Sequence, residues 1–246
     1  RWDVIGWTMA VHHAAWVSQE FKYLKSTGNW EKLWSEAIRE SHVGHPVPYW
    51  RYPRSSPNLI HTAYHLAQFQ ENTKLCIENS PTIIEFGGGY GCMSRLVHTI
   101  GFRGKYVLFD LPSFSAIQQF YLQSVGLTVH SIDSFMKANS GIVCVSDIES
   151  LRVILSESID ISTATFIATW SLSETPINLR NKVWAMVSNC ERFLIASQSQ
   201  HREVDNIEYF RRLKDSHPNI NWSTKQIKHL GRNFYLFGVR RHDDRQ

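Results

Sequence analysis

One segment limits the fold of this chain more than any other. The apolar run 82–86 ends in three consecutive glycines, and a fourth glycine follows Tyr90. Glycines at the end of a buried strand let the backbone turn tightly, and they let a ligand approach without meeting a Cβ atom. The next apolar run, 105–109, leads directly into Asp110. An acid there lies beside the glycine turn and can accept hydrogen bonds from a ribose, so the pair predicts a nucleoside-binding unit.

The chain after Pro81 alternates short apolar runs with helical stretches. The runs that predict strands are 82–86, 105–110, 127–130, 142–145, 164–169, 192–196 and 233–239. Continuous apolar strands separated by helices are typical of a mostly parallel sheet covered on both faces. We therefore expect an α/β fold in which residues 81–246 form a Rossmann-like, doubly wound domain with a seven-stranded sheet.

The first 80 residues have a different pattern, and six of the nine tryptophans lie within the first 50. Apolar spacing and the N-cap signals at Asn29 and Ser56 predict helices over 4–24, 29–40 and 57–78. We expect residues 1–80 to form a helical cap on the acceptor side of the site. The tryptophans expected in the core of this cap, or in a homodimer interface, are Trp7, Trp16, Trp30 and Trp34.

Composition excludes several classes of function. The net charge of +4 is mild and evenly spread, which does not indicate a nucleic-acid partner. The four cysteines form no CxxC pair and are typical of a reducing compartment, so we expect a cytoplasmic protein. No apolar run reaches the ~18 residues of a membrane span. The chain starts at Arg1 rather than Met, so residues that precede it can be missing.

The spacing of the glycines separates two kinds of nucleoside cofactor. The dinucleotide pattern needs a glycine at its sixth position, where counting from Gly87 gives Cys92. The spacing that fits is Gly87-x-Gly89-x-Gly91, preceded by an acid at Glu85. This spacing resembles motif I of the class I methyltransferases, which use S-adenosylmethionine and have no diphosphate to bind.

Further segments make the chain similar to a bacterial family of sugar O-methyltransferases. The matching segments are 85–91, 109–112, 118–122, 171–174, 205–206 and 235–238, and the resemblance covers roughly residues 46–240. It implies an enzyme that transfers a methyl group from S-adenosylmethionine to a hydroxyl of a sugar or glycosylated small molecule. Two alternatives stay open: a nonsugar acceptor methylated on oxygen, nitrogen or carbon, and an inactive cofactor-binding module that serves interactions.

The resemblance also implies which residues hold the cofactor. They are Glu85, Gly87, Gly89 and Gly91 at its methionine part, Asp110 with Leu111 at its ribose, and Trp170. For the adenine, the sequence allows Asp133 or the pair Asp147 and Ile148. We favour the pair, because an acid after a buried strand can accept from the adenine amino group while the next apolar side chain packs on the ring. A solvated loop acid is the alternative for either aspartate.

Two loops that follow predicted strands contain candidates for catalysis. A sugar hydroxyl ionises far above neutral pH, so a general base contributes ~10²–10⁴-fold to the rate. His201 has a suitable intrinsic pKa for that role. Glu174 either acts directly or orients a histidine. The simpler alternatives are a helix-capping Glu174 and a solvated His201.

The acceptor side is expected to be aromatic and polar. The predicted substrate-binding residues are Tyr49, Arg54, His61, His65 and Asp205. Flat rings and guanidinium groups suit sugar faces and anionic groups, although the rings and histidines of the cap can equally form its core. The spacing of Asp205 from Glu203 and Glu174 does not demand a metal ion, so none is predicted.

Overall fold

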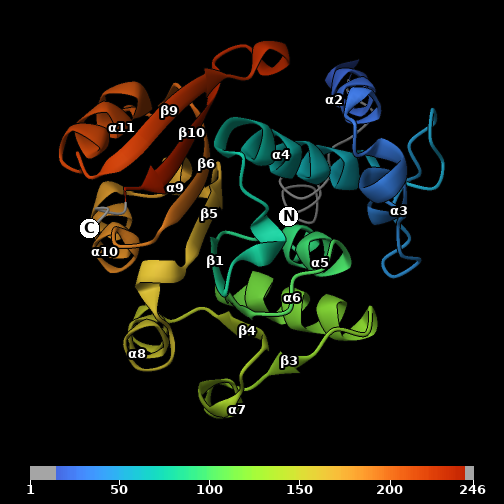
Figure 1. Cartoon of the computed structure of the whole chain (residues 1–246). Helices are drawn as coiled ribbons and strands as arrows, with labels where there is room; N and C mark the ends of the chain where they lie inside the picture. The colour runs from blue at the N-terminus through green and yellow to red at the C-terminus, as the bar shows by residue number, and fades with distance from the viewer. Residues whose placement is uncertain (1–14, 242–246) are drawn as a thin grey trace, which may run out of the picture.

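The structure is a computed structural model that describes residues 15–241, with an eight-stranded sheet at its centre (Figure 1). The strands are β1 (Thr82–Phe86), β2 (Lys105–Phe109), β3 (Val129–His130), β4 (Gly141–Val145), β5 (Thr165–Thr169), β6 (Arg192–Gln198), β9 (Ile220–Gln226) and β10 (Asn233–Arg240). Their order is β3-β4-β2-β1-β5-β6-β10-β9. Strands β1 to β6 are parallel, whereas β10 runs antiparallel to both β6 and β9. The predicted α/β class and mostly parallel sheet are confirmed.

The predicted number of strands is wrong, because the sheet has eight strands rather than seven. All the predicted runs form strands, and the missed strand is β9 at the outer edge. Only Ile220 of its seven side chains is buried. An antiparallel edge strand can expose most of its side chains to water, so it lacks the continuous apolar run that marks the other strands.

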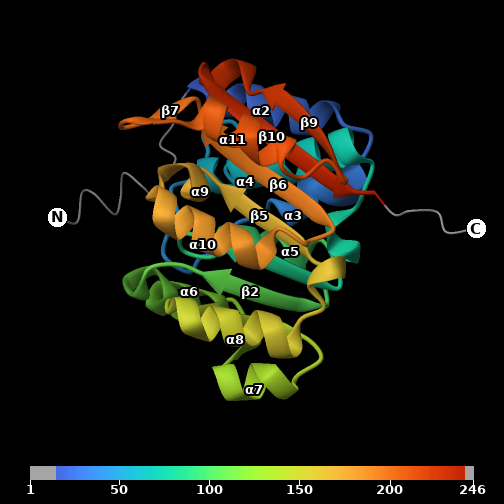
Figure 2. The ribbon, with the colours of Figure 1, turned by 90° about the vertical axis from the view of Figure 1, so that its left-hand side faces the viewer.

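Helices cover both faces of the sheet, and Figure 2 shows one of the two layers from the front. One layer contains α4 (Pro57–Thr73), α5 (Cys92–Thr99) and α6 (Pro112–Ser124). The other contains α7 (Ile132–Lys137), α8 (Ile148–Ser158), α10 (Ile177–Val187) and α11 (Asn206–Asp215). Alternate strand residues point into these two cores, as Ile83 and Ile84 of β1 do. Within residues 15–241, no helix is both long and apolar enough to cross a membrane.

The N-terminal helices follow the predicted order but with different ends. The described part of the first is α2 (Ala15–Ser26); the rest of the predicted helix, with Trp7, lies outside the described residues. The second consists of the π-helical turn η1 (Trp30–Trp34) and α3 (Ser35–Ala37), so it ends before residue 40. The third, α4, begins as predicted, because the Ser56 hydroxyl accepts the N–H of Leu59 at 3.1 Å. It ends at Thr73, well before the predicted residue 78.

These helices share a hydrophobic core with one face of the sheet. Trp34 is buried, and Trp16 and Trp30 pack against the same cluster. That cluster continues through α4 to Tyr235 and Phe237 on β10. The described part of the N-terminal region therefore packs on the sheet as a continuation of its helical layer. The division into units at residue 80 and a homodimer through these helices remain predictions.

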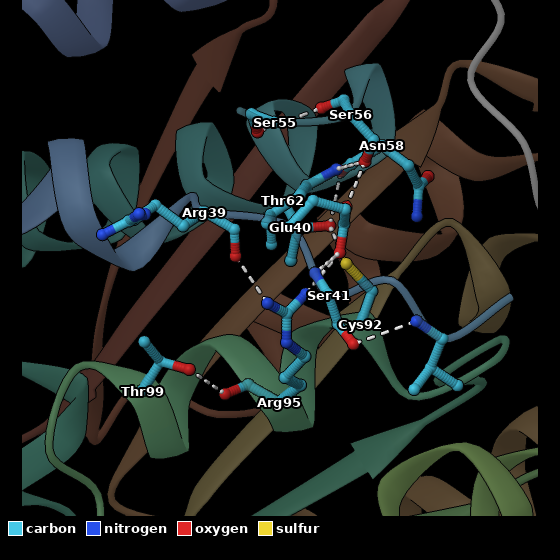
Figure 3. Close-up of polar contacts among 12 residues, drawn as sticks. Arg39, Glu40, Ser41, Ser55, Ser56, Asn58, Thr62, Cys92, Arg95 and Thr99 are labelled. Carbon is cyan, nitrogen blue, oxygen red and sulfur yellow. Dashed lines mark hydrogen bonds and ion pairs between the residues drawn. The ribbon is translucent and has the colours of Figure 1, made fainter. Parts of the chain in front are cut away.

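A largely enclosed ion pair joins the N-terminal region to the helix that follows the glycine turn. Figure 3 shows Glu40 between Ser56 and Arg95; it accepts the Ser56 hydroxyl at 2.5 Å and pairs with the Arg95 guanidinium. Arg95 also donates to the backbone oxygen of Arg39 at 2.5 Å. The paired side chains are only 12% and 11% exposed. Because Ser56 caps α4 and Arg95 lies on α5, this contact fixes α4 relative to the turn.

Candidate active site

The glycine turn between β1 and α5 has one closely packed side and one open side. Gly87 and Gly89 both have positive φ, at 77° and 57°, a region that favours glycine. A Cβ on Gly87 would lie 2.2 Å from the Cβ of Ser171, so packing alone requires glycine there. A Cβ on Gly89 would meet no other atom within 4 Å. The backbone at Gly89 is therefore the part of the turn that a ligand can approach.

Asp110 lies beside this turn, as the sequence predicts. One carboxylate oxygen accepts the N–H of Gly89 at 3.1 Å and the amide of Gln118 at 3.0 Å. The other accepts the N–H of Leu111 at 2.8 Å, and the Leu111 side chain is exposed. Burial raises the pKa of Asp110 above its ordinary value. The carboxylate is thus held in one orientation at the end of β2.

Gln118 is a residue of this site to which the sequence analysis gave no role. Its side-chain amide also donates to the backbone oxygen of Gly89 at 2.9 Å, so it links both sides of the turn to Asp110. Its buried Oε1 has no partner among the described residues. Two signals pointed to this residue, its position eight residues after Asp110 and its place in the matching segment 118–122, but neither gave its side chain a role.

Glu85 lies beneath the turn rather than on its open side. The residue is only 2% exposed, and the hydroxyl of Tyr106 donates to its Oε2 at 2.7 Å. A Cβ on Gly88 would lie 3.0 Å from the Glu85 carboxyl carbon. Burial raises the pKa of Glu85 to about 8, so the carboxyl is largely protonated at neutral pH. Its hydrogen bond supports the strand below the turn.

The sheet order distinguishes the two candidate adenine acids. β4 lies directly beside β2, so the pair Asp147 and Ile148 follows the strand next to Asp110. Asp133 instead belongs to α7, which follows the edge strand β3. Asp147 is exposed and also caps α8, accepting the N–H of Ser150 at 2.8 Å. That hydrogen bond lowers the pKa of Asp147.

Trp170 connects the turn to the N-terminal helices. It follows β5 with φ of 62°, an uncommon value for a bulky residue that persists only where surrounding contacts fix it. Its N–H donates to the oxygen of Ala196 at 2.8 Å, and its indole N–H donates to Asn233 at 2.7 Å. The next residue, Ser171, donates its hydroxyl to the backbone oxygen of Phe86, directly before the turn.

One face of α4 covers this region. Asn58 donates to the Tyr90 hydroxyl of the turn at 2.9 Å, and the Thr62 hydroxyl contacts the sulfur of Cys92 at 3.4 Å. On the same face, the His61 ring stacks on Trp170 with ring centres 5.4 Å apart and an angle of 28°. The structure therefore places this predicted acceptor residue against Trp170, on the face of α4 that contacts the glycine turn.

His65 lies on the same face but is enclosed. It is only 3% exposed and shares a hydrogen bond of 2.5 Å with the hydroxyl of Tyr235. Its ring centre is 5.2 Å from that of Trp170. Burial and the neighbouring His61 and His229 hold the pKa of His65 well below its ordinary value, so it is neutral.

The two predicted catalytic residues meet at one amide. The Gln198 amide nitrogen donates to Glu174 at 3.3 Å and lies 3.2 Å from Nδ1 of His201. Its oxygen accepts the Ser173 hydroxyl at 2.8 Å. His201 belongs to a short hairpin of β7 (Gln200–His201) and β8 (Val204–Asp205) that follows β6, and Glu174 ends the short helix α9 (Ser171–Glu174).

Three of the predicted acceptor residues have other surroundings. Tyr49 is 1% exposed and packs on Phe21 with ring centres 5.7 Å apart, so its prediction as a substrate-binding residue is wrong: it is a core residue. Asp205 caps α11 by accepting the N–H of Glu208 at 3.0 Å. Arg54 is exposed and lines a surface cavity of about 560 Å³. In the described part of the chain, no three or more His, Cys, Asp or Glu side chains are arranged so that they could hold a metal ion.

The fold is similar to those of several solved methyltransferase structures. The methyltransferase domain of bacterial CtHen1-C superposes with a TM-score of 0.50 and 9% identity, over 75% of this chain and 99% of that one. An rRNA methylase from Streptococcus thermophilus gives 0.49 and 10%, over 73% and 95%. The glycopeptide N-methyltransferase MtfA with S-adenosylmethionine gives 0.46 and 13%, over 72% and 87%. No family model and no curated protein sequence matches. The chain thus has the Rossmann-like fold of the CtHen1-C methyltransferase domain.

Proposed function

We propose that this protein is an S-adenosylmethionine-dependent O-methyltransferase that acts on a hydroxyl of a sugar or glycosylated small molecule. The observation that carries the cofactor assignment is the hydrogen bond between Asp110 and the open backbone of Gly89. It joins a fixed carboxylate to an approachable turn at the carboxyl edge of the sheet, where ligands bind in open α/β folds.

The residues at this edge fit the parts of the cofactor. The open side of Gly89 leaves room for the methionine part, and Asp110 accepts from the ribose hydroxyls. Asp147 with Ile148 receives the adenine, one strand farther along the edge. When bound, the cofactor supplies an activated methyl group; the protein binds it, positions the acceptor and excludes water.

The acceptor is proposed to lie where Trp170 and α4 meet. The indole of Trp170 and the partly exposed ring of His61 combine aromatic surface with a hydrogen-bonding group, which suits a sugar. The bacterial sugar O-methyltransferase resemblance supports the same acceptor class. All four cysteines are free, which supports action in the reducing cytoplasm.

Calorimetry with S-adenosylhomocysteine and with NAD⁺ tests the cofactor. We expect the first to bind and Asp110→Ala to weaken it by about 1.5–3 kcal/mol, or roughly 10- to 150-fold, since hydrogen bonds to a charged group are lost. Asp133→Ala on α7 is the matched control and is expected to bind normally. Binding of NAD⁺ alone would contradict the proposal.

The acceptor requires a separate screen. Labelled S-adenosylmethionine is incubated with nucleotide sugars, glycosides and flat phenolics, and transfer of the label is counted. Methylation of a sugar hydroxyl is the expected result. Labelled phenolics alone, or transfer to nitrogen, would keep the enzyme class and reject the sugar.

A further inference from the structure

A buried carboxylate holds two histidines that come from distant parts of the chain. Glu20 on α2 is fully buried. His61 on α4 reaches it through Nδ1 at 2.9 Å, and His229 on the short helix η4 (Lys228–Leu230) reaches it through Nε2 at 2.8 Å. This Glu20 cluster is outside every segment on which the cofactor assignment depends.

The partners of Glu20 determine its charge and the protonation of the rings. Burial alone would raise the pKa of Glu20, but attraction to His61 and hydrogen bonds from both histidines lower it overall, so the carboxylate is ionised. An ionised carboxylate only accepts hydrogen bonds, so His61 carries its proton on Nδ1. No described residue hydrogen-bonds Nε2, so that nitrogen has a free lone pair whenever the ring is neutral.

The His61 ring lies between Glu20 and the cofactor turn. One side meets Glu20, and its face stacks on Trp170, whose neighbour Ser171 touches the turn at Gly87. One helical turn earlier on α4, Asn58 binds Tyr90 of the same turn. His61 is therefore the histidine of α4 that packs on Trp170 and keeps one ring nitrogen without a partner among the described residues.

We infer that His61, oriented by Glu20, is the general base of the methyl transfer; this inference rests on the proposed function. Nε2 takes the hydroxyl proton while the acceptor oxygen bonds to the methyl carbon, and the electron pair of the broken carbon–sulfur bond stays on sulfur. The imidazolium that results is stabilised by the adjacent carboxylate and later releases its proton to water. Glu20 is a positioning residue, which fixes the tautomer of the ring.

The alternative base, His201, is less suitably arranged. Its Nδ1 faces the amide nitrogen of Gln198, which can only donate, so the neutral ring carries its proton on Nε2. Both ring nitrogens are then unavailable as acceptors while that contact lasts. Glu174, the carboxylate of this group, accepts a hydrogen bond from Gln198 and, within residues 15–241, none from the His201 ring.

Other titratable side chains lie around His61 and can influence its protonation. The titratable groups that face it are Glu20 on α2, His65 on its own helix at a ring distance of 4.2 Å, and His229 beyond Glu20. His65 is neutral and does not repel a proton on His61. A general base reacts only after it has lost its proton, so loss of the rate on the acid side of the pH profile is the signature that the inference requires.

His61→Asn is the most direct test. Asparagine can keep a donor to Glu20 near the position of Nδ1 but removes Nε2. We expect methyl transfer to slow by about 10²- to 10⁴-fold, with the affinity for S-adenosylhomocysteine unchanged within about twofold and the acid limb lost. His98→Asn, which removes a ring bonded only within α5, is the control and is expected to keep the full rate.

Two further measurements separate a failed base from a misfolded protein. In His61→Ala, added imidazole is expected to restore part of the rate. In the ¹⁵N spectrum of the histidine-labelled protein without cofactor, His61 is expected as the Nδ1–H tautomer near pH 8. An Nε2–H tautomer, an unchanged rate in His61→Asn, or an acid limb lost only in His201→Asn would overturn the inference. If the unaltered protein binds no S-adenosylhomocysteine, the proposed function fails. The tautomer measurement still shows whether Nδ1 of His61 donates to Glu20, so the two failures can be distinguished.

Discussion

Glu85 under the glycine turn and Glu20 in the N-terminal helices are both fully enclosed, but Glu85 is largely protonated at neutral pH and Glu20 is ionised. Glu85 is bonded by one neutral hydroxyl, from Tyr106, and burial raises its pKa to about 8. Glu20 is bonded by two imidazoles, and its pKa is lowered. Their exposures are 2% and 0%, so burial does not explain the difference. The partners decide whether a buried carboxyl is charged.

This difference matches the chemistry proposed for the glycine turn and for His61. A neutral carboxyl under the turn adds no negative charge to Asp110, which is itself largely buried. An ionised carboxylate beside His61 stabilises the positive charge that a base acquires. The same residue type thus supports the turn in one place and tunes a reactive ring in the other.

The largest expected effect comes from depriving a third enclosed carboxylate of its partner. Glu40 pairs with Arg95, with both side chains about nine-tenths inaccessible. Arg95→Met keeps much of the packing but leaves the carboxylate without a counter-charge, so we expect the free energy of unfolding to fall by about 3–5 kcal/mol. Urea denaturation measures it.

The control for this prediction is an ion pair in water. Arg211 on α11 bonds to Glu208 and Asp215, and all three side chains are exposed. Arg211→Met is expected to leave the urea midpoint unchanged, since exposed pairs contribute little. If Arg95→Met and Arg211→Met lower the free energy of unfolding equally, enclosure of the ion pair does not determine its contribution to stability.

The second prediction concerns the pH dependence that a neutral buried carboxyl imposes. The pKa of Glu85 is about 8 in the folded protein and 4.5 as its ordinary value, so between these values the folded state holds a proton that the unfolded state has lost. Stability from this group is complete below about pH 4.5 and falls by about 1.4 kcal/mol per pH unit as pH rises toward 8. Glu85→Gln removes the titrating group.

Urea unfolding of both proteins at pH 5.5, 6.5 and 7.5 measures this effect. The stability of Glu85→Gln relative to the unaltered protein is expected to rise by about 1.4 kcal/mol per pH unit. A constant difference across the series would mean that Glu85 is ionised in the folded state, and the contrast with Glu20 would disappear.

Sequence reasoning was strong where the contacts are local. The turn, the strand before it and Asp110 come from one strand–turn–helix–strand unit, in which spacing fixes geometry. All seven predicted strands form, because each is a continuous apolar run that can be recognised within its own segment. Ser56 as the N-cap of α4 was predictable because capping involves a residue only three positions ahead.

The Glu20 cluster was not predictable, because its members are widely separated in sequence. Glu20 and His61 belong to different helices, and His229 lies between the last two strands along the chain. A charged residue in an amphipathic helix is ordinarily solvated, so no local signal marks Glu20 as buried. Tyr49 failed in the opposite sense: a tyrosine in a loop suggested recognition, and packing placed it in the core.

The smallest expected effect tests an exposed carboxylate at the far end of the proposed cofactor site. Asp147 follows the strand beside Asp110 and caps α8. If Asp147 also accepts a hydrogen bond from the adenine amino group, Asp147→Ala lowers the affinity for S-adenosylhomocysteine by roughly three- to tenfold. This is the contribution of one ordinary hydrogen bond. Asp205→Ala removes the equivalent cap of α11 and is expected to leave that affinity unchanged. Equal affinities in both variants, measured by calorimetry, would reduce Asp147 to a helix cap, and Ile148 would then be left as the adenine contact of this loop.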